Sequence, residues 1–444
     1  MKKTSYSYSQ IWKVAYPILL TLLVQNLIQV IDTAFLGRVG EVELGASAIA
    51  GIFYIAMFTI AFGFSSGSQI LIGRRNGEKN YGKIGEIVIW GIIFLWILAL
   101  VIFLFTRIFA APILEKVLHS KNVLEASIEY LDWRIWGLFF STINVMFRAF
   151  FVGITKTKIL SVNAAIMALT NVFFDYVLIF GHWGFPEMGI AGAAFASVIS
   201  EATSVLFFII YLISTVNLRK YGFSLYIWGK FQIIRNILNV SLSLMIQYFL
   251  SLSTFLVFFL FIERMGETTL AVSNIIRSFY MIIAIPVFAL ASTANTLVSN
   301  TIGAGKQNEV ISLIWKVSQF SLMIVFVFIL LIGIFPKTAL SIYTTDVNLI
   351  RQSIPSLYVI LFVVPIMAIG NVFFSSVSGT GNTRPALYIE IIALFLYSFW
   401  VWFTAVHIQA PLAVCWTAEL VYAVFIGFFS FVYFKRGKWV NKQI

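Results

Sequence analysis

Long apolar runs recur along the whole chain, and they constrain its fold more than any other feature. About 20 apolar residues are enough for a helix to cross the hydrocarbon core of a membrane. Because a spanning segment must satisfy its own backbone hydrogen bonds, each run is predicted to be helical. The predicted fold class is therefore an all-α polytopic membrane protein with twelve transmembrane helices. The twelve runs cover residues 11–36, 46–73, 86–110, 127–152, 159–181, 189–214, 233–262, 270–302, 310–334, 350–378, 385–406 and 410–434.

The composition excludes a soluble enzyme and a disordered chain. Of the 444 residues, 60% are hydrophobic and 11% are charged, whereas a soluble domain has about 25% charged residues. The single cysteine, Cys415, lies in an apolar run, so no disulfide framework or cysteine metal cluster is expected. The three histidines are far apart in sequence and give no basis for a zinc site or a catalytic triad. We therefore expect a protein that is not an enzyme.

Basic residues are concentrated in alternate connections, and this predicts the orientation of the helices. The formal net charge is +12, which in a soluble protein suggests nucleic acid. Here the positive-inside rule assigns the more basic side to the cytoplasm, so both termini are expected there and no nucleic-acid partner is expected. The basic segments on that side are the N-terminus with Lys2 and Lys3, and residues 74–83, 156–158, 219–235 and 435–442.

Three loop motifs of the first half recur in the same order in the second half. In the first motif Gly40 stands opposite Gly266, and in the second Gly73 stands opposite Gly303. Each pair is separated by six predicted spans, which indicates a duplicated six-helix unit related by an axis along the membrane normal. We predict two pseudo-symmetric lobes: an N-lobe of helices 1–6 over residues 1–220, and a C-lobe of helices 7–12 over residues 221–444.

Two acids, Asp32 and Asp175, lie inside predicted spans, where an ionised residue costs about 2.5–3.5 kcal/mol on insertion scales. Each stands a few residues before the outer end of its helix, so the helical rise places both at nearly one depth. Asn171 is one turn from Asp175, and Ser197 lies at a comparable level. These oxygens suit a Na⁺ ion, and two close carboxylates can also share a proton. The alternative is that the two acids only hold neighbouring helices together.

A second polar set is predicted to line a substrate cavity. Gln25 and Gln29 precede Asp32 on its helix face, and Asn144 and Glu201 are further candidates. Glu201 has an equally good interpretation as a structural residue at a helix interface. Pro17 lies inside the first span and is predicted to bend it, because proline removes one backbone hydrogen bond.

The chain resembles the multidrug and toxic compound extrusion (MATE) family over its whole length. The resemblance implies a cation-coupled antiporter that exports lipophilic or cationic drugs by alternating access across a bacterial inner membrane, driven by Na⁺ or H⁺. It also implies an ion site at Asp32, Asn171, Asp175 and Ser197, with no other metal or cofactor, and we expect a monomer whose partners are the bilayer and its small-molecule substrates. The residues that carry the resemblance are QNLIQVIDTAFLGRVG (25–40), IGRRNGEKNYGKIGE (72–86), RAFFVGITKTK (148–158), NVFFDYVLIFG (171–181), MGIAGAAFASVIS (188–200) and SGTGNTRP (378–385).

The chain departs from part of the family in its second half. Members that use a glutamate in helix 7 or an aspartate in helix 10 have no counterpart here, where Gln247 and Asn371 are the nearest polar residues. An alternative within the superfamily is a lipid-linked oligosaccharide flippase, which needs a strongly cationic cavity. A channel or intramembrane enzyme lacks a filter-like sequence or a His/Glu cluster. The candidate buried basic residues for a flippase cavity are Arg134, Arg148, Arg277 and Lys316.

Overall fold

The computed structural model describes residues 4, 6–223, 231–437 and 439–440, and throughout these residues the regular structure is helical. Eleven helices are long and apolar enough to cross a membrane, and a bent helix pair completes a twelfth span. The predicted all-α fold with twelve transmembrane helices is therefore confirmed. Some predicted cytoplasmic basic residues lie outside the described residues, namely Lys2, Lys3, Lys230, Lys438 and Lys442.

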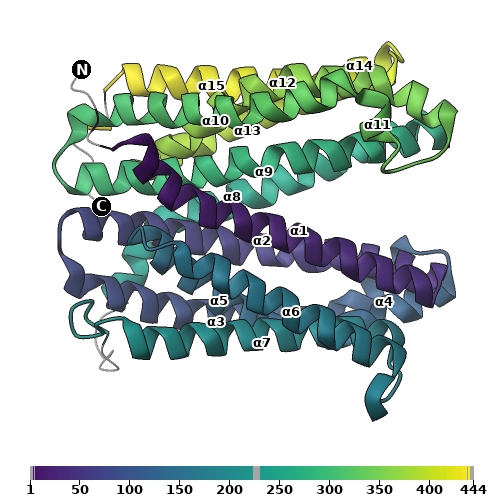
Figure 1. Ribbon diagram of the computed structural model, residues 1–444, viewed down its shortest axis with the longest axis horizontal. Helices are drawn as coiled ribbons and strands as arrows, with labels where there is room; N and C mark the ends of the chain where they lie inside the picture. Colours follow the sequence, from purple (N-terminus) through teal and green to yellow (C-terminus); the bar gives the residue numbers. More distant parts are fainter. Residues whose placement is uncertain (1–3, 5, 224–230, 438, 441–444) are drawn as a thin grey trace. The chain divides into compact units, whose positions relative to one another are not determined.

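The first half of the chain contains seven helices (Figure 1). The fourth predicted span is not one continuous helix, because α4 and α5 meet at an angle of 53°. The predicted span over 127–152 is thus helical but broken at residues 135–136, beside the charged side chains of Arg134 and Glu201. The seven helices are α1 (Tyr8–Val39), α2 (Glu41–Gly77), α3 (Ile84–Val117), α4 (Lys121–Arg134), α5 (Gly137–Gly153), α6 (Lys158–Phe180) and α7 (Gly189–Thr215).

The second half adds eight helices, two of which are very short. A five-residue π-helical turn, Phe403–His407, continues α13, and α14 and α15 together form the last span. The helices are α8 (Phe231–Glu263), α9 (Glu267–Gly303), α10 (Val310–Ile334), α11 (Pro336–Leu340), α12 (Val347–Gly379), α13 (Thr383–Trp402), α14 (Leu412–Cys415) and α15 (Ala418–Lys435).

The internal repeat is visible in helix lengths and turns. The helices α2 and α9 both have 37 residues and follow Gly40 and Gly266, as the first motif predicts. Positive φ angles occur at Lys79 and at Gly305, 226 positions later. The pairing of Gly73 with Gly303 is wrong by one helical turn, because α2 ends at Gly77, which is the residue 226 positions before Gly303. The loop sequences alone were not enough to find the correct pairing, since both loops contain several glycines.

The chain forms two compact units whose boundaries fall inside α1 and α8. One unit is Leu20–Met245, and the other combines the described residues up to Leu19 with those from Ile246 onward. Met245 follows Leu19 by 226 positions, which is the spacing of the repeat. The first helix of each half thus contributes residues to both units. The predicted lobe boundary between residues 220 and 221 stays a prediction.

In the unit Leu20–Met245, α6 and α7 lie side by side, and α2 packs along α4 and α5 (Figure 1). α6 ends at Phe180 because Gly181 has a φ of 68°, a left-handed conformation that favours glycine. The contact between α6 and α7 depends on Gly192. A Cβ atom built there lies 2.7 Å from the carbonyl oxygen of Leu178. The absence of a side chain lets α7 approach the segment of α6 that carries Asn171 and Asp175.

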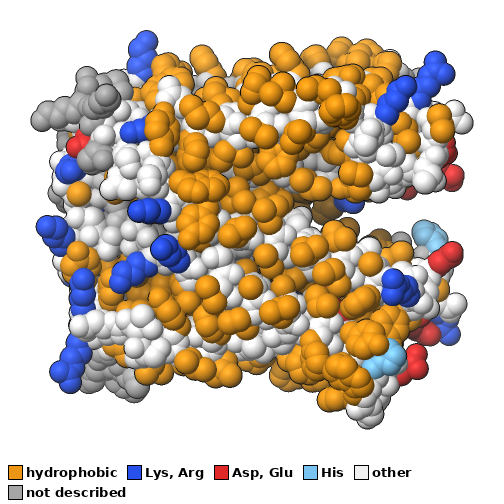
Figure 2. Space-filling model, viewed as in Figure 1, with side chains coloured by type: hydrophobic (Ala, Val, Ile, Leu, Met, Phe, Trp, Pro, Cys, Tyr) orange, Lys and Arg blue, Asp and Glu red, His pale blue; other side chains and the backbone are white. Residues whose placement is uncertain are grey.

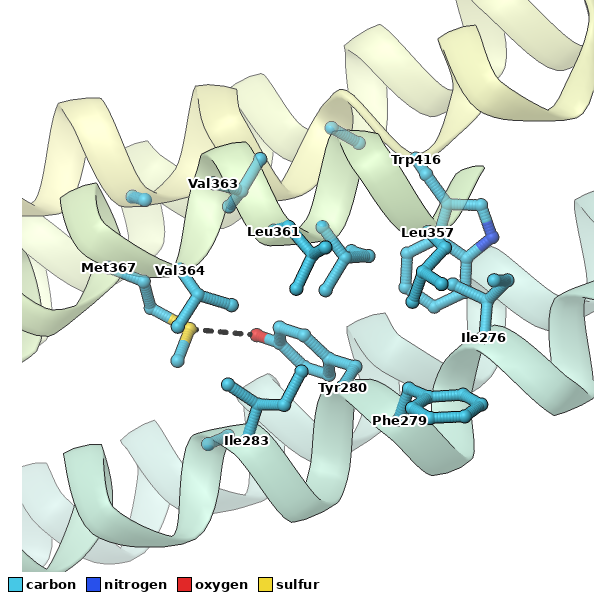
Figure 3. Packing of buried hydrophobic residues seen from close by; sticks show 14 of the residues in the cluster. Ile276, Phe279, Tyr280, Ile283, Leu357, Leu361, Val363, Val364, Met367 and Trp416 are labelled. Carbon is cyan, nitrogen blue, oxygen red and sulfur yellow. Dashed lines mark hydrogen bonds between the residues drawn. The ribbon is translucent and has the colours of Figure 1, made fainter. Parts of the chain in front are cut away.

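In the other unit, α12 packs along α9 and α15 around an extensive hydrophobic cluster. Figure 3 shows Tyr280 of α9 pointing into this cluster, with its hydroxyl 3.2 Å from the sulfur of Met367 on α12. Trp416 closes one end of the cluster and is fully buried. Aromatic and aliphatic side chains make up this cluster.

The surface of each unit is divided along its helices. Hydrophobic side chains cover the sides of the helices, Lys and Arg gather at one end, and most visible Asp, Glu and His lie at the other end (Figure 2). This is the division expected of helices that cross a membrane with their charges in the two aqueous phases. The protein is accordingly a multi-pass membrane protein.

The N-terminal segment is held on α10 by polar contacts. Lys316 donates to the carbonyl oxygen of Tyr6 at 2.7 Å and lies over the ring of Tyr8. Tyr8 donates to the side chain of Gln319 at 3.0 Å. Burial raises the pKa of the Tyr6 phenol, although its hydrogen bond with Thr301 acts in the opposite direction. The start of α1 is therefore fixed within the unit that contains α10.

We expect Gly192→Ala to destabilise the protein, because the new methyl group must push α7 away from the backbone of α6. Overpacking of this kind costs about 1–3 kcal/mol, and we expect a lower melting temperature of the purified protein. Gly51→Ala in α2 is the matched control, since a Cβ there meets no atom within 4 Å. Equal melting temperatures for the two variants contradict the close approach.

Candidate functional site

Asp32, Asn171 and Asp175 meet between α1 and α6. The Asn171 amide, oriented with its nitrogen toward the carboxyls, donates to Oδ1 of Asp32 at 3.0 Å and to Oδ2 of Asp175 at 3.2 Å. The two carboxyl groups also interact directly. Three of the four predicted ion-site residues are thus brought together, from positions that are more than a hundred residues apart in sequence.

Packing beyond the carboxyls fixes the register of α1 against α6. The rings of Phe35 and Phe180 meet edge to face with centroids 5.8 Å apart. Leu36 and Ile179, each one turn beyond a carboxyl, belong to one buried cluster. The predicted equal depth of Asp32 and Asp175 is the consequence of this register.

The environment of the pair is unequal and largely dry. Asp175 and Asn171 are fully buried, whereas Asp32 is half-buried. Oδ1 of Asp175 is buried and has no hydrogen-bond partner in the part of the chain that the structure describes. An ionised carboxylate in such a place is costly unless a proton or a cation neutralises it. The arrangement can therefore hold a proton or a small cation.

The remaining residues of the predicted set differ in their surroundings. Ser197 is buried on α7, and among the described residues its hydroxyl makes no hydrogen bond to either carboxyl. Gln25 and Gln29 are exposed on α1, two turns and one turn before Asp32, respectively. Pro17 is buried in the same helix, two residues before the boundary between the units. Their predicted functional roles stay predictions.

Glu201 forms an ion pair that the sequence analysis did not predict. Arg134 forms a bidentate ion pair with Glu201, with N–O distances of 2.6 and 3.1 Å. Asn144 donates to the backbone oxygen of Glu201 at 3.0 Å and accepts from Ser204 at 2.8 Å. Glu201 and Asn144 are therefore neighbours, as a shared cavity wall requires, but the charge of Glu201 is balanced. The available signal was Arg134 itself, a cation inside a predicted span.

A hollow of about 610 Å³ opens at the end of this unit beyond the carboxyl pair. Its lining includes Ala126 and Ile190, which also belong to the buried cluster with Leu36 and Ile179. The hollow therefore lies over the same cluster that covers the carboxyls, and its field attracts cations. Its four acidic residues are Glu41, Glu43, Glu125 and Glu129.

The other unit buries two glutamates in a different way. Glu390 on α13 accepts from Ser251 at 2.5 Å and from Tyr422 at 3.1 Å. Glu419 on α15 accepts from Tyr280 at 2.8 Å and from Tyr397 at 3.2 Å. Hydroxyl groups satisfy both carboxyls, so these two acids tie α13 and α15 to α8 and α9.

Comparison with known families settles what kind of chain this is. A family model described as MatE matches residues 17–177 and again residues 243–403. The chain belongs to the MatE family. The predicted family resemblance is confirmed, and so is the expectation that the protein is a transporter and not an enzyme. The two MatE matches start and end 226 positions apart, the spacing found in the helices.

Similar MatE proteins extend over nearly the whole chain. A probable multidrug resistance protein NorM of Thermotoga maritima is 25% identical over 436 residues, which covers 97% of this chain and 93% of that protein. A probable multidrug resistance protein YoeA of Bacillus subtilis is 23% identical over 447 residues and covers 96% of this chain and 93% of its own.

Solved structures share the fold of this MatE chain. An outward-facing conformation of a multidrug resistance MATE family transporter of the MOP superfamily has a TM-score of 0.90 at 16% identity, with 100% of both chains covered. A mutant of the Vibrio cholerae MATE transporter VcmN has a TM-score of 0.87 at 17% identity, with 98% of both chains covered.

The two MatE repeats differ at the positions of the carboxyl pair. At the 226-residue spacing, Asp32 corresponds to Phe258 and Asp175 corresponds to Val401. Both residues are buried in the hydrophobic cluster of the second unit. The carboxyl pair is consequently a feature of one repeat.

We expect Asn171→Leu to destabilise the protein, because the two carboxyls lose their shared donor and leave buried acceptors unpaired. Such a loss typically costs about 1–3 kcal/mol, measured as a drop in the melting temperature of the purified protein. Asn26→Leu is the matched control, since the amide of Asn26 donates only within its own helix, to Leu22 at 3.0 Å. A stability of Asn171→Leu equal to that of the control contradicts the bridging role.

Proposed function

We propose that the protein is a cation-coupled antiporter that exports lipophilic or cationic drugs by alternating access. The observation that carries this proposal is the contact of Asp32, Asn171 and Asp175 in a dry part of one unit. A site that needs a proton or a cation for neutrality binds that cation and releases it when its surroundings change. Multidrug resistance relatives support drugs as the exported cargo.

The distribution of charge supports a direction for the cation. The hollow with four glutamates lies beyond the carboxyl pair, at the end of the unit opposite to the basic loops. The positive-inside rule makes the basic end cytoplasmic. We therefore propose that cations enter the carboxyl site from the outside of a bacterial inner membrane and that both termini face the cytoplasm.

The exposed amides of α1 support a cavity next to the ion site. Gln25 and Gln29 lie on the helix that carries Asp32, and polar side chains at membrane depth normally face a water-filled space. We assign these two residues to the substrate path, with Asn144 and the balanced Glu201 at its wall. A bend of α1 at Pro17 is the proposed moving part, because proline leaves that turn without one hydrogen bond.

The basic residues give no support to a lipid-linked oligosaccharide flippase. Such a protein needs free positive charge for a pyrophosphate group. Arg134 is neutralised by Glu201, and Lys316 is bound to the backbone of Tyr6. The guanidinium groups of Arg148 and Arg277 lie over the rings of Phe62 and Phe259.

We expect Asp32→Asn and Asp175→Asn to abolish drug efflux driven by an ion gradient, because a neutral amide can neither take up the proton nor balance a cation. The loss should reach at least tenfold in proteoliposomes loaded with a fluorescent cationic drug. Glu115→Gln, at an exposed position near the end of α3 and outside the acidic hollow, is the control and should retain wild-type efflux. Full coupled efflux by Asp32→Asn rules out the proposed mechanism.

The coupling ion follows from varying the two gradients independently in the same vesicles. If the carboxyl pair shares a proton, an inward pH gradient alone drives efflux. If it holds Na⁺, a Na⁺ gradient at equal pH drives efflux instead. Efflux that needs neither gradient contradicts antiport.

A further inference from the structure

The proposed cycle places Glu201 at the cavity wall but gives its charge and that of Arg134 no task, although their ion pair is the most deeply buried one among the described residues. The exposed fractions of its side chains are 12% and 6%. Burying two charges usually costs more than an apolar pair of the same volume. A charged pair within a membrane-spanning segment therefore indicates a function beyond holding two helices together.

The protein builds a fitted site around this pair. The bend between α4 and α5 places Arg134 at the end of α4, and a Cβ atom at Gly137 would collide with both Arg134 Nη1 and Glu201 Oε2. The ring of Tyr54 lies 3.8 Å from the guanidinium carbon of Arg134. The Tyr54 hydroxyl is 3.2 Å from that of Ser141. Four helices, α2, α4, α5 and α7, thus fix the position of two opposite charges.

The pair lies in the same dry region as the two carboxyls. Tyr130, one turn before Arg134, packs against the buried cluster of Leu36 and Ile179, which are each one turn beyond a carboxyl. Arg134 attracts the Asp32 carboxylate. The titratable and charged groups that face one another here are Asp32 of α1, Tyr54 of α2, Tyr130 and Arg134 of α4, Asp175 of α6 and Glu201 of α7.

We propose that Arg134 and Glu201 are a positioning pair whose charges set how tightly Asp32 and Asp175 hold their coupling cation. This inference rests on the proposed antiport function. Arg134 disfavours an added cation at Asp32, and Glu201 offsets that effect by neutralising Arg134. The bend, Gly137 and Tyr54 hold the two opposing charges in place. The carboxyl pair then releases its cation within the range of pH or Na⁺ concentration in which the antiporter works.

Removing one charge at a time tests the proposal because the two effects have opposite signs. Arg134→Gln leaves Glu201 negative, so the cation binds more tightly and the pH midpoint of coupled efflux rises. Glu201→Gln leaves Arg134 positive, so binding weakens and the midpoint falls. Removing a neighbouring charge in a partly buried site changes such a midpoint by about one pH unit. For Na⁺ the same signs apply to its half-saturating concentration, with a change of about tenfold.

Three further variants separate an electrostatic role from a structural one. The double variant Arg134→Gln with Glu201→Gln should fall between the two single variants. Exchanging the charges, Arg134→Glu with Glu201→Arg, keeps an ion pair for folding and should raise the midpoint, because the negative end now faces Asp32. Arg107→Gln is the control, since its ion pair with Asp132 joins α3 and α4 of the same unit but is 40% and 48% exposed.

The outcomes test the positioning role of the ion pair separately from the antiport function. Opposite shifts of the single variants, with an unchanged midpoint in Arg107→Gln, support the positioning role. Shifts in one direction, or wild-type midpoints in every variant that folds, overturn it while leaving antiport intact. If a single variant does not fold, the exchanged pair still decides, because a wild-type midpoint there overturns the inference. A wild-type protein without cation-coupled efflux contradicts the proposed function, and this inference with it.

Discussion

The cost of placing a charge where water cannot reach it governs the polar interior of this protein. The acids of the interior meet that cost by three different physical routes. Asp32 and Asp175 share an amide donor and need a proton or a cation, Glu201 is neutralised by an arginine, and Glu390 and Glu419 accept from hydroxyl groups. Only the first route leaves a carboxyl oxygen of the site unpaired. That difference is the reason for proposing cation exchange at the carboxyl pair and a structural role for the other acids.

The duplication supplies two similar helical frames, and side chains make them unequal. The helices α2 and α9 have equal length and start 226 positions apart, so the backbone offers both halves the same positions. At two of these equivalent positions the first half has Asp32 and Asp175, whereas the second half has Phe258 and Val401. A hydrophobic core at these positions stabilises its unit by burial alone. The carboxyl pair gives up part of that stabilisation, which is the usual relation between function and stability.

The sequence was sufficient for features that depend on local pattern. Apolar runs predicted the twelve spans because membrane thickness fixes their length, and the constant helical rise predicted that Asp32 and Asp175 share a depth. Features that depend on two distant side chains were out of reach. Arg134 and Glu201 are 67 positions apart on different helices, and no periodicity links them. The break after α4 has the same origin, since Ile135 and Trp136 give no signal of a turn. The register of the second loop motif failed because several glycines competed for one position.

α1 carries the anchored N-terminal segment, Pro17 and Asp32 on one helix. Its first residues are anchored on α10 through Tyr6, Tyr8 and Lys316, and its last turns carry Asp32 against α6. The boundary between the units lies at Leu19, two residues after Pro17, where the helix lacks one backbone hydrogen bond. A helix fixed at one end and charged at the other conveys any displacement of Asp32 toward its weakest turn. A change in the charge of the carboxyl pair therefore acts on both helices that carry it, on α1 through Asp32 and on α6 through Asp175.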